Sequence, residues 1–533
     1  MTISRRSLLQ AGVATGTALS FPSVLRSQTT LASTQAVRMV KSGDLGVFDP
    51  MISSYYITAD HGSAIYDTLF ALDSRMTPQP QMVGNWGVSD DKKTYTFVLR
   101  DGLGWHDGTP VTAGDCVASI RRWVEVASGG QLIKALATDI SKKDDKTFTI
   151  ALKEPLGLLI EILATLTPPC LFIMREKDAN TPSTDPVTAN IGSGPFTFNQ
   201  ELARPGASFT YDRNERYVPR REASDGLAGR KVVKVDRVIW DNIADQQTAL
   251  AALQTGEIDY LESVPMDLLP VLEGNPDIAL QVLNQGGFVR YLRINFLQKP
   301  FNNLKARHAL LYLIDQEAAM RTSSPPEYIK TVTSLFGTKT AYINDENTGW
   351  FKKGGDPEKA KELFQEAGYA GEKVVIVQVT NIAWMSNVAQ YVAHTLRKIG
   401  VNAELNPTDW GAVTARLDNK GSVDEGGWSI YPTADVDFAM GDVLGNPIFL
   451  ANGDKAWYGW PHNDEYEALY ARWATVATLE ERQSLAREMQ RVWWGFVGSV
   501  YLGATTLPVA RRASLTGLIG MPVIVPMWNM QKS

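Results

Sequence analysis

The chain has 533 residues, 44% of them hydrophobic and 21% charged, with a formal net charge of −6. This composition excludes a disordered or fibrous protein, and the length predicts two or three domains because a single core stops growing well before this size. The acidic balance argues against nucleic acid or an anionic membrane surface as the main partner.

The N-terminus has the pattern of an export signal. Arg5 and Arg6 stand directly before Ser-Leu-Leu, and an uncharged, weakly apolar run follows over residues 11–25. The paired arginines resemble the twin-arginine signal, so we expect residues 1–36 to be removed and the protein to act in the periplasm. Removal takes away three arginines and moves the formal charge from −6 to −9. No later segment has the 18 or so uninterrupted apolar residues of a membrane span, so the mature chain is predicted to be soluble.

The remaining chain alternates short strands with amphipathic helices, which is typical of an α/β protein. Residues 94–100 and 146–152 alternate apolar and polar side chains, as half-buried strands do. Residues 374–379 form a continuous apolar run, which indicates a strand covered on both faces.

Capping residues mark several predicted helices. Thr112 with Asp115 forms an acidic variant of the capping box, and Asp356 followed by Pro357 is a typical helix start. Gly368 is placed to end the helix that Asp356 begins. The clearest predicted helices span 111–126, 245–254, 304–320, 356–366 and 480–494.

Motifs of catalysis are missing from the sequence. It has no Gly-x-Ser-x-Gly elbow, no His-Glu-x-x-His and no glycine-rich phosphate loop. Ser193 lies in a Gly-Ser-Gly-Pro turn, where Pro195 blocks the helix that follows a nucleophile elbow. The five histidines lack ligand spacing, so we expect no metal, no cofactor and no enzymatic activity. Cys116 and Cys170 are the only cysteines, and whether they pair stays open.

A long, ordered series of motifs resembles the peptide/nickel/oligopeptide-type (family 5) solute-binding proteins of bacterial ABC importers. The densest part runs from Tyr-Asp-Thr-Leu-Phe at 66–70 to Trp-His-Asp-Gly-Thr-Pro-Val-Thr-Ala at 105–113. Most of these residues read as scaffold, His106 among them, since they form turns rather than a converging polar group. Further matches follow in order at 192–196, 214–217, 251–259, 293–295, 300–310, 359–369 and 396–400.

The resemblance implies a bilobal periplasmic-binding-protein fold (type II, large class with an extra domain), with the ligand cleft between two α/β lobes. Lobe I would collect residues 37–62, 191–286 and 500–533. The extra domain would span 63–190, and lobe II would span 287–499. Chain crossings near 285–290 and 498–503 would serve as hinges, because their glycines suit lobe closure.

The segment around Trp428 resembles the part of the family that lies at the cleft. In dipeptide- and oligopeptide-binding relatives, an aspartate shortly after this tryptophan pairs with the α-amino group of the ligand. Here Tyr431 stands at that position, and acids come only at Asp435 and Asp437. A phenol cannot neutralise a buried ammonium, and this weakens the assignment to a dipeptide. A ligand without a free amino terminus becomes an alternative: a blocked peptide, an opine-like conjugate, a sugar or another organic solute.

Other candidate ligand-binding residues lie in loops beside predicted strand ends, where aromatic walls and directed polar groups would form a cleft. Arg290 among them could hold a carboxylate by two parallel hydrogen bonds. For each aromatic residue of this set, core packing is an equal alternative. The full set of candidates is Tyr55, Tyr56, Phe288, Arg290, Trp384, Trp410, Trp428, Tyr431 and Asp435.

The sequence therefore predicts a monomeric extracytoplasmic protein that captures a peptide-like or related small organic solute. It would deliver that solute to the ABC permease subunits of the inner membrane for import. Three alternatives stay open: an oligosaccharide, opine or nickel-complex binder on the same fold, a secreted hydrolase, and a receptor-coupled sensor or chaperone-like factor.

Overall fold

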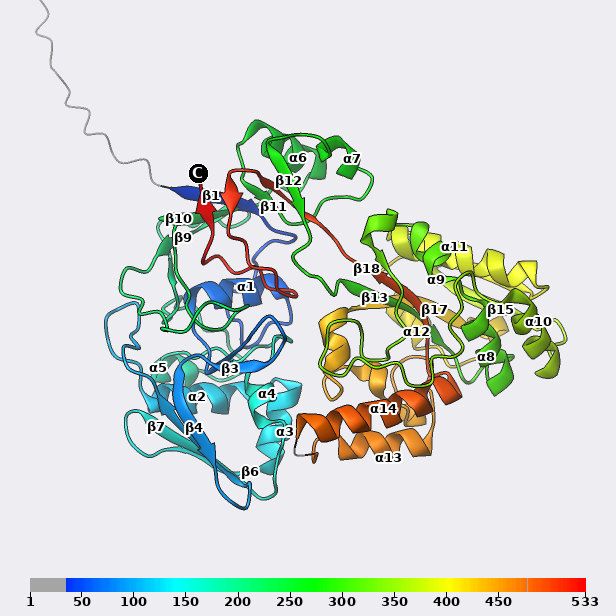
Figure 1. Ribbon diagram of the computed structural model, residues 1–533, viewed down its shortest axis with the longest axis horizontal. Coiled ribbons are helices and arrows are strands. Elements are labelled where there is room, and N and C mark those ends of the chain that lie inside the picture. Colours follow the sequence, from blue (N-terminus) through cyan, green and yellow to red (C-terminus); the bar gives the residue numbers. More distant parts are fainter. Residues whose placement is uncertain (1–34, 477) are drawn as a thin grey trace, which may run out of the picture. The chain divides into compact units, whose positions relative to one another are not determined.

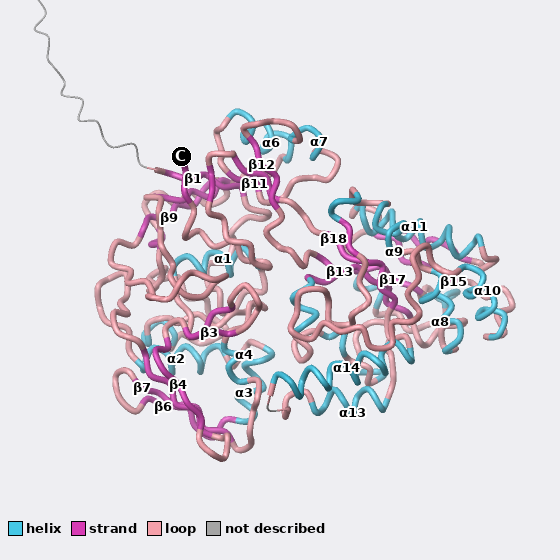
Figure 2. The backbone as a smooth tube through the Cα atoms, viewed as in Figure 1, coloured by secondary structure: helices cyan, strands magenta, loops and turns pink. Residues whose placement is uncertain are grey.

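The computed structural model describes residues 35–476 and 478–533, and strands and helices alternate throughout this part of the chain (Figure 1, Figure 2). The predicted export signal, up to residue 34, lies outside the described residues. Within them, no helix has both the length and the apolar character needed to cross a membrane. Buried side chains of three separate sheets, such as Val37, Phe97 and Tyr291, join one continuous hydrophobic cluster.

The first sheet has seven strands, one of which, β1, is the first strand of the described chain. β1 runs parallel to its neighbours β10 and β11, and the other pairs are antiparallel. In spatial order the strands are β12 (Ile278–Gln281), β19 (Val509–Arg512), β11 (Tyr260–Leu261), β1 (Ala36–Val40), β10 (Arg237–Asp241), β9 (Ser208–Arg213) and β8 (Phe196–Phe198). Helices α1 (Tyr56–Ile65), α6 (Gln246–Thr255) and α7 (Leu269–Leu272) pack against β8, β11 and β12 respectively.

The second sheet has six strands. In spatial order they are β14 (Ile329–Lys330), β18 (Val500–Thr505), β13 (Phe288–Ile294), β17 (Ile430–Val436), β15 (Val374–Val379) and β16 (Ala403–Thr408). Every residue of β15 is buried and β15 pairs parallel with both neighbours, which confirms the strand predicted from its continuous apolar run. The accompanying helices are α8 (Leu304–Leu313), α9 (Gln316–Arg321), α10 (Pro357–Glu366), α11 (Ala383–Lys398), α12 (Val413–Leu417), α13 (Asp464–Arg472) and α14 (Leu479–Phe496).

The third sheet is an antiparallel set of four strands. They are β4 (Val83–Val88), β5 (Thr94–Leu99), β7 (Thr147–Leu152) and β6 (Ala137–Lys142), and the two strands predicted from alternation are β5 and β7. The nearby helices are α2 (Ala113–Trp123), α3 (Ser128–Leu136), α4 (Leu159–Leu163) and α5 (Glu176–Ala179). Thr112 and Asp115 form the predicted capping box of α2. The carboxylate of Asp115 also accepts the backbone N–H of Glu176, so the cap ties α5 to α2.

The remaining elements are short. The remaining strands are β2 (Phe70–Leu72), β3 (Pro78–Pro80), β20 (Leu515–Thr516) and β21 (Gln531–Lys532). Single 3₁₀ turns are η1 (Pro326–Tyr328), η2 (Val423–Glu425), η3 (Asp437–Gly441), η4 (Pro447–Phe449) and η5 (Gly453–Lys455). Of these, η3 continues directly from β17, and Asp442 follows its last residue.

The single helix predicted over 304–320 is wrong, because the segment forms two helices, α8 and α9, separated by Ile314 and Asp315. Ile314 leaves the helical conformation at the end of α8, with ψ of 117°. The side chain of Asp315 then accepts the backbone N–H groups of Glu317 and Ala318 and begins α9. An aspartate favours the N-cap over a helix interior because its short side chain competes for backbone amides. By contrast, Asp356 caps α10 as predicted, by accepting the N–H of Lys359.

The chain passes twice between the seven-stranded and the six-stranded sheets. The first passage lies between β12 and β13, over 282–287, close to the predicted crossing at 285–290. The second lies between β18 and β19, over 506–508. Since β18 pairs with β13, this passage comes after the predicted crossing at 498–503 and after the predicted lobe boundary at 500. The division into lobes and an extra domain stays a prediction, with its last boundary moved.

Gly192 and Gly194 bring an extended segment against the end of α1. The N–H of Gly194 donates to the carbonyl oxygen of Ile65 at 2.9 Å, which satisfies a carbonyl at the helix end. His106 holds the same segment, since its Nδ1 accepts the N–H of Gly192 at 3.1 Å and its own backbone N–H donates to the Gly192 carbonyl at 2.8 Å. Burial lowers the pKa of His106 to about 4 and keeps Nδ1 free to accept. These contacts give His106 the structural role predicted for it.

Candidate functional site

A cavity with about 1200 Å³ of empty space, part of it open to solvent, lies between two walls that are distant in sequence. The first wall consists mainly of apolar residues from segments 72–78, 123–129 and 158–169, including Trp123, Leu158, Ile162 and Leu166. The second wall comes from segments 339–342 and 438–445 and from Trp473. Large aromatic and aliphatic surfaces with a few polar groups are typical of sites for small organic ligands.

Two hydrogen-bonded contacts join the walls. The hydroxyl group of Thr167 donates to the carboxylate of Asp442 at 3.1 Å. Glu161 accepts from Arg482 at 2.7 Å, and the Arg482 side chain is almost fully buried. Thr167, Asp442 and Glu161 all line the cavity, so the contacts that join the walls also supply its polar lining.

Asp442 has no lysine, arginine or histidine partner within the described residues. Besides Thr167, its carboxylate accepts the N–H of Gly445 at 3.0 Å. Burial raises the pKa of Asp442, and these two hydrogen bonds oppose the rise. This carboxylate, whose hydrogen-bond donors are neutral, therefore lines a mainly apolar cavity that also includes Glu161 and Lys339.

Asp435 is a second carboxylate of the same kind. It accepts from the hydroxyl of Tyr291 at 2.7 Å and from the side-chain amide of Asn446 at 3.4 Å, and it too makes no ion pair among the described residues. Burial raises the pKa of Asp435, and the nearby charge of Arg293 lowers it only in part. Burial, together with the negative charges of Asp435 and Asp442, raises the pKa of Tyr56 to about 12. The charges of both carboxylates therefore act on the phenol of Tyr56.

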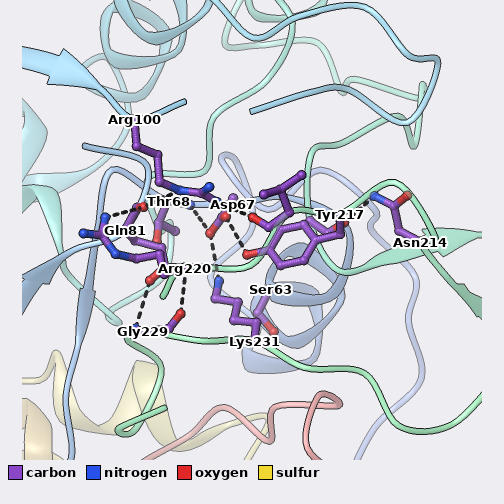
Figure 3. A network of polar contacts seen from close by, with 12 residues as sticks. Ser63, Asp67, Thr68, Gln81, Arg100, Asn214, Tyr217, Arg220, Gly229 and Lys231 are labelled. Carbon is purple, nitrogen blue, oxygen red and sulfur yellow. Dashed lines mark hydrogen bonds and ion pairs between the residues drawn. The ribbon is translucent and has the colours of Figure 1, made fainter. Parts of the chain in front are cut away.

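Two other buried aspartates, Asp67 and Asp49, already have cationic partners. Asp67 binds Lys231 at 2.8 Å and accepts from the hydroxyl of Tyr217 at 3.0 Å, and Figure 3 shows these groups converging on it. Asp49 likewise binds Arg122 at 2.7 Å. Such pairs neutralise their charges internally, whereas Asp435, Asp442 and the fully buried Asp437 make no ion pair with a described residue. Asp437 accepts the backbone N–H groups of Thr338 and Lys339 instead.

Tyr56, at the start of α1, and Asp435, near the end of β17, influence each other electrostatically, but neither lines the cavity. Asp435 is linked to the cavity edge through its hydrogen bond with Asn446, the residue after the lining segment 438–445. Arg290 and Trp384 meet, since the guanidinium lies 4.5 Å from the centre of the indole ring. They belong to a different location, between β13 and the start of α11.

The other predicted residues do not line the cavity. Trp428 and Tyr431 are buried in a separate hydrophobic cluster with Trp460, and the Trp428 indole N–H donates to the carbonyl of Leu417. Tyr55 and Trp410 are 68% and 53% exposed. Phe288 is partly buried at the start of β13, opposite Val436. A ligand contact for any of these residues stays a prediction.

Sequence reasoning missed Asp442, Thr167, Glu161 and Arg482. Glu161 had a usable signal, because it is the one charged residue inside the most apolar stretch of the chain, residues 156–174. Asp442 had none, since it is an ordinary acid in a Gly-Asp-Val-Leu-Gly turn and its isolation from cations depends on the tertiary structure.

The described residues contain no cluster of three or more His, Cys, Asp or Glu side chains arranged to hold a metal ion. Cys116 and Cys170 are both buried free thiols, and burial raises the pKa of each. The polar lining of the cavity consists of the carboxylates of Glu161 and Asp442, hydroxyl groups such as that of Thr167, and Lys339. These groups can orient a ligand through hydrogen bonds and charge.

Comparison with known proteins gives a consistent result. Residues 77–447 match the model of the bacterial extracellular solute-binding proteins, family 5. The chain is 61% identical, over its whole length and that of the relative, to a Sinorhizobium fredii protein named "Probable peptide ABC transporter periplasmic-binding protein y4tO". It is 27% identical to the glutathione-binding protein GsiB of Escherichia coli, with 98% of this chain and 97% of the relative covered.

A solved structure supports the fold. The ABC transporter substrate-binding protein CtaP of Listeria monocytogenes aligns with 93% of this chain and 99% of its own, at a TM-score of 0.77 and 23% identity. This agreement shows the α/β bilobal binding-protein fold that the sequence motifs predict.

Proposed function

Because the chain belongs to the family 5 bacterial extracellular solute-binding proteins, we propose that it captures a peptide-like solute with a positively charged amino group and delivers it to an ABC permease. The observation that carries the proposal is a pair of carboxylates without an ion-pair partner: Asp442, which lines the mainly apolar cavity, and Asp435, which is linked to the cavity edge through Asn446. Binding involves no chemical turnover. The named relatives that bind peptides or glutathione favour this solute class.

The carboxylate pair changes the expected ligand. Tyr431 stands where an acid is expected shortly after Trp428. That difference weakened the assignment to a solute with a free amino group. Asp435 and Asp442 supply negative charge from other positions, and an ammonium group would replace the missing internal counter-charge. The apolar wall around Trp123 and Leu166 suits hydrophobic side chains of the solute.

The test is a binding screen of the mature protein by thermal shift and calorimetry. Free leucyl-leucine and longer apolar peptides should raise the melting temperature, and their N-acetylated forms should not, because acetylation removes the ammonium charge. Asp442→Asn should weaken binding of the free peptide about 10- to 100-fold, the loss expected for one charge-assisted hydrogen bond.

The matched control is Asp345→Asn, which removes the same charge from an exposed residue and should leave the affinity unchanged. Equal binding of free and acetylated peptides would exclude the ammonium contact. The screen also includes opines, oligosaccharides and nickel chelates. If one of these alone stabilises the protein, the peptide proposal is wrong, and product formation from any of them would indicate the hydrolase instead.

We further propose that the protein acts in the periplasm as a monomer, after export by the twin-arginine route. Arg5 and Arg6 stand where that route requires paired arginines. Replacing both by lysine should keep the precursor in the cytoplasm, as cell fractionation would detect. Periplasmic accumulation of the double variant would argue for a different export route, and light scattering of the mature chain reports its mass.

The lobes are proposed to close over the cavity by rotation at the two passages between the larger sheets, 282–287 and 506–508. Gly287 has a positive φ of 69° in the first passage, which a glycine tolerates at little cost. Small-angle scattering with and without a bound peptide measures this closure, and an unchanged radius of gyration would contradict it.

A further inference from the structure

Arg290 is a buried arginine that forms no ion pair with a described acidic residue. Its side chain extends from β13 and the residue is only 6% exposed. Nη1 donates to the hydroxyl of Ser323 at 2.5 Å, and one face of the guanidinium stacks on Trp384. No carboxylate pairs with Arg290 in residues 35–476 and 478–533. Burial alone lowers the pKa of the Arg290 guanidinium, to about 10. The group therefore stays charged at neutral pH.

The guanidinium keeps one edge available. Nε and Nη2 of Arg290 donate to no described residue. Neither nitrogen is fully buried, because the fully buried polar atoms without a partner do not include them. These two nitrogens therefore touch solvent, while Nη1 and the stacked face are occupied. Nε and Nη2 form the edge through which arginine donates two parallel hydrogen bonds to a carboxylate.

The surroundings reinforce this geometry. Trp384 is in the first turn of the 16-residue helix α11, whose N-terminal end carries a partial positive charge. The hydroxyl group of Ser324, next to Ser323, is buried and has no hydrogen-bond partner. A buried cation, a helix N-terminus and a free hydroxyl near one another are costly to keep unless an anion joins them.

We propose that Arg290, Trp384 and Ser323 form a subsite for a carboxylate group, carried by the transported solute. Trp384 holds the guanidinium plane in position, and Ser323 fixes its rotation, so the Nε–Nη2 edge is oriented before the solute arrives. The assignment of the carboxylate to the solute rests on the proposed function, while the anion subsite itself rests on these contacts alone.

The subsite and the carboxylate pair lie at the same end of the six-stranded sheet. Arg290 pairs with Ala434 of β17, the residue before Asp435. Since successive strand residues point to opposite faces, Arg290 and Asp435 project from opposite faces at that end. A solute that reached both groups would lie across the ends of β13 and β17, with its ammonium and carboxylate groups held apart.

The test compares leucyl-leucine with leucyl-leucinamide, which differ only in the C-terminal carboxylate, by calorimetry on the mature protein. The free acid should bind about 10- to 100-fold more tightly than the amide, as two charge-assisted hydrogen bonds predict. Arg290→Gln should abolish that preference without changing the affinity for the amide. Arg321→Gln is the matched control, because Arg321 is an exposed cation at the end of α9, and it should keep the preference.

Two further measurements test the subsite if the first variant does not fold or if neither dipeptide binds. If Arg290→Gln does not fold, Arg290→Lys retains the charge but cannot form two parallel hydrogen bonds, and it should lose most of the preference. If neither dipeptide binds, the proposed solute class fails, and sodium acetate tests the subsite alone. Acetate should then stabilise the wild type, relative to chloride at equal ionic strength, but not Arg290→Gln. Equal responses of the two proteins, or a preference that survives Arg290→Gln, would overturn the subsite.

Discussion

Lys41→Met should destabilise the protein by about 3–5 kcal/mol, the usual effect of removing one partner from a buried ion pair. Lys41 lies at the end of β1 with only 3% of its side chain exposed, and its ammonium group binds Asp60 at 2.6 Å and also binds Glu262. Methionine fills similar space but leaves two carboxylates buried together without a counter-charge. The free energy of unfolding in urea measures the loss.

The pH dependence of this loss has a definite sign. Burial raises the pKa of Asp60 to about 6 in the native protein although Lys41 opposes the rise, and without Lys41 the pKa rises further. A carboxyl whose native pKa is raised binds protons more readily when folded, so acidification stabilises the native state relative to the unfolded one. The defect of Lys41→Met should therefore shrink as the pH falls from above 6 towards 4.

The control is Lys146→Met, which breaks an exposed ion pair with Asp101 and should leave stability nearly unchanged. A Lys41→Met protein as stable as the wild type at pH 7, or one whose defect grows on acidification, would show that the buried group does not depend on Lys41. The same network reaches the C-terminal segment, because Asp60 also accepts the N–H of Val525 at 2.7 Å.

Local patterns predicted most of the elements because their causes are local. The apolar run at 374–379 is β15, and the capping residues Thr112 and Asp356 begin α2 and α10. The same reasoning failed at Asp315, where helical periodicity continued through a residue that caps a new helix. An N-cap inside an apolar repeat can be identified from sequence only if the chain is also known to turn there.

The site was harder to predict from the sequence than the fold, because it depends on which carboxylates have no cationic partner in the folded protein. Tyr56 could be nominated from its place in a loop beside a predicted strand, and Asp435 from the family resemblance of the segment that follows Trp428. Asp442 could not, because many acids of the chain lie in similar turns, and only the folded structure shows which of them meet a lysine or arginine. Trp428 attracted attention through the family motif, yet in the structure its ring packs in a hydrophobic cluster.

Gly192→Ala should be among the most damaging single substitutions in the described chain, with a loss of about 4 kcal/mol or more. A Cβ atom at this position would lie 1.6 Å from the carbonyl oxygen of Ile65, at the end of α1. That oxygen belongs to the backbone and accepts the N–H of Gly194, so it cannot move aside without breaking the contact that ends the helix. The urea midpoint and the soluble yield measure the effect.

Gly349→Ala provides the matched control, since Gly349 is exposed, has no positive φ and would place a Cβ in open space. It should leave the midpoint unchanged, which separates the steric effect from any general effect of losing a glycine. A tolerated Gly192→Ala would mean that the 192–194 segment can move away from α1 without loss of stability. The close approach explains the motif physically: His106 fixes the segment from one side and α1 from the other, so only a residue without a side chain fits between them.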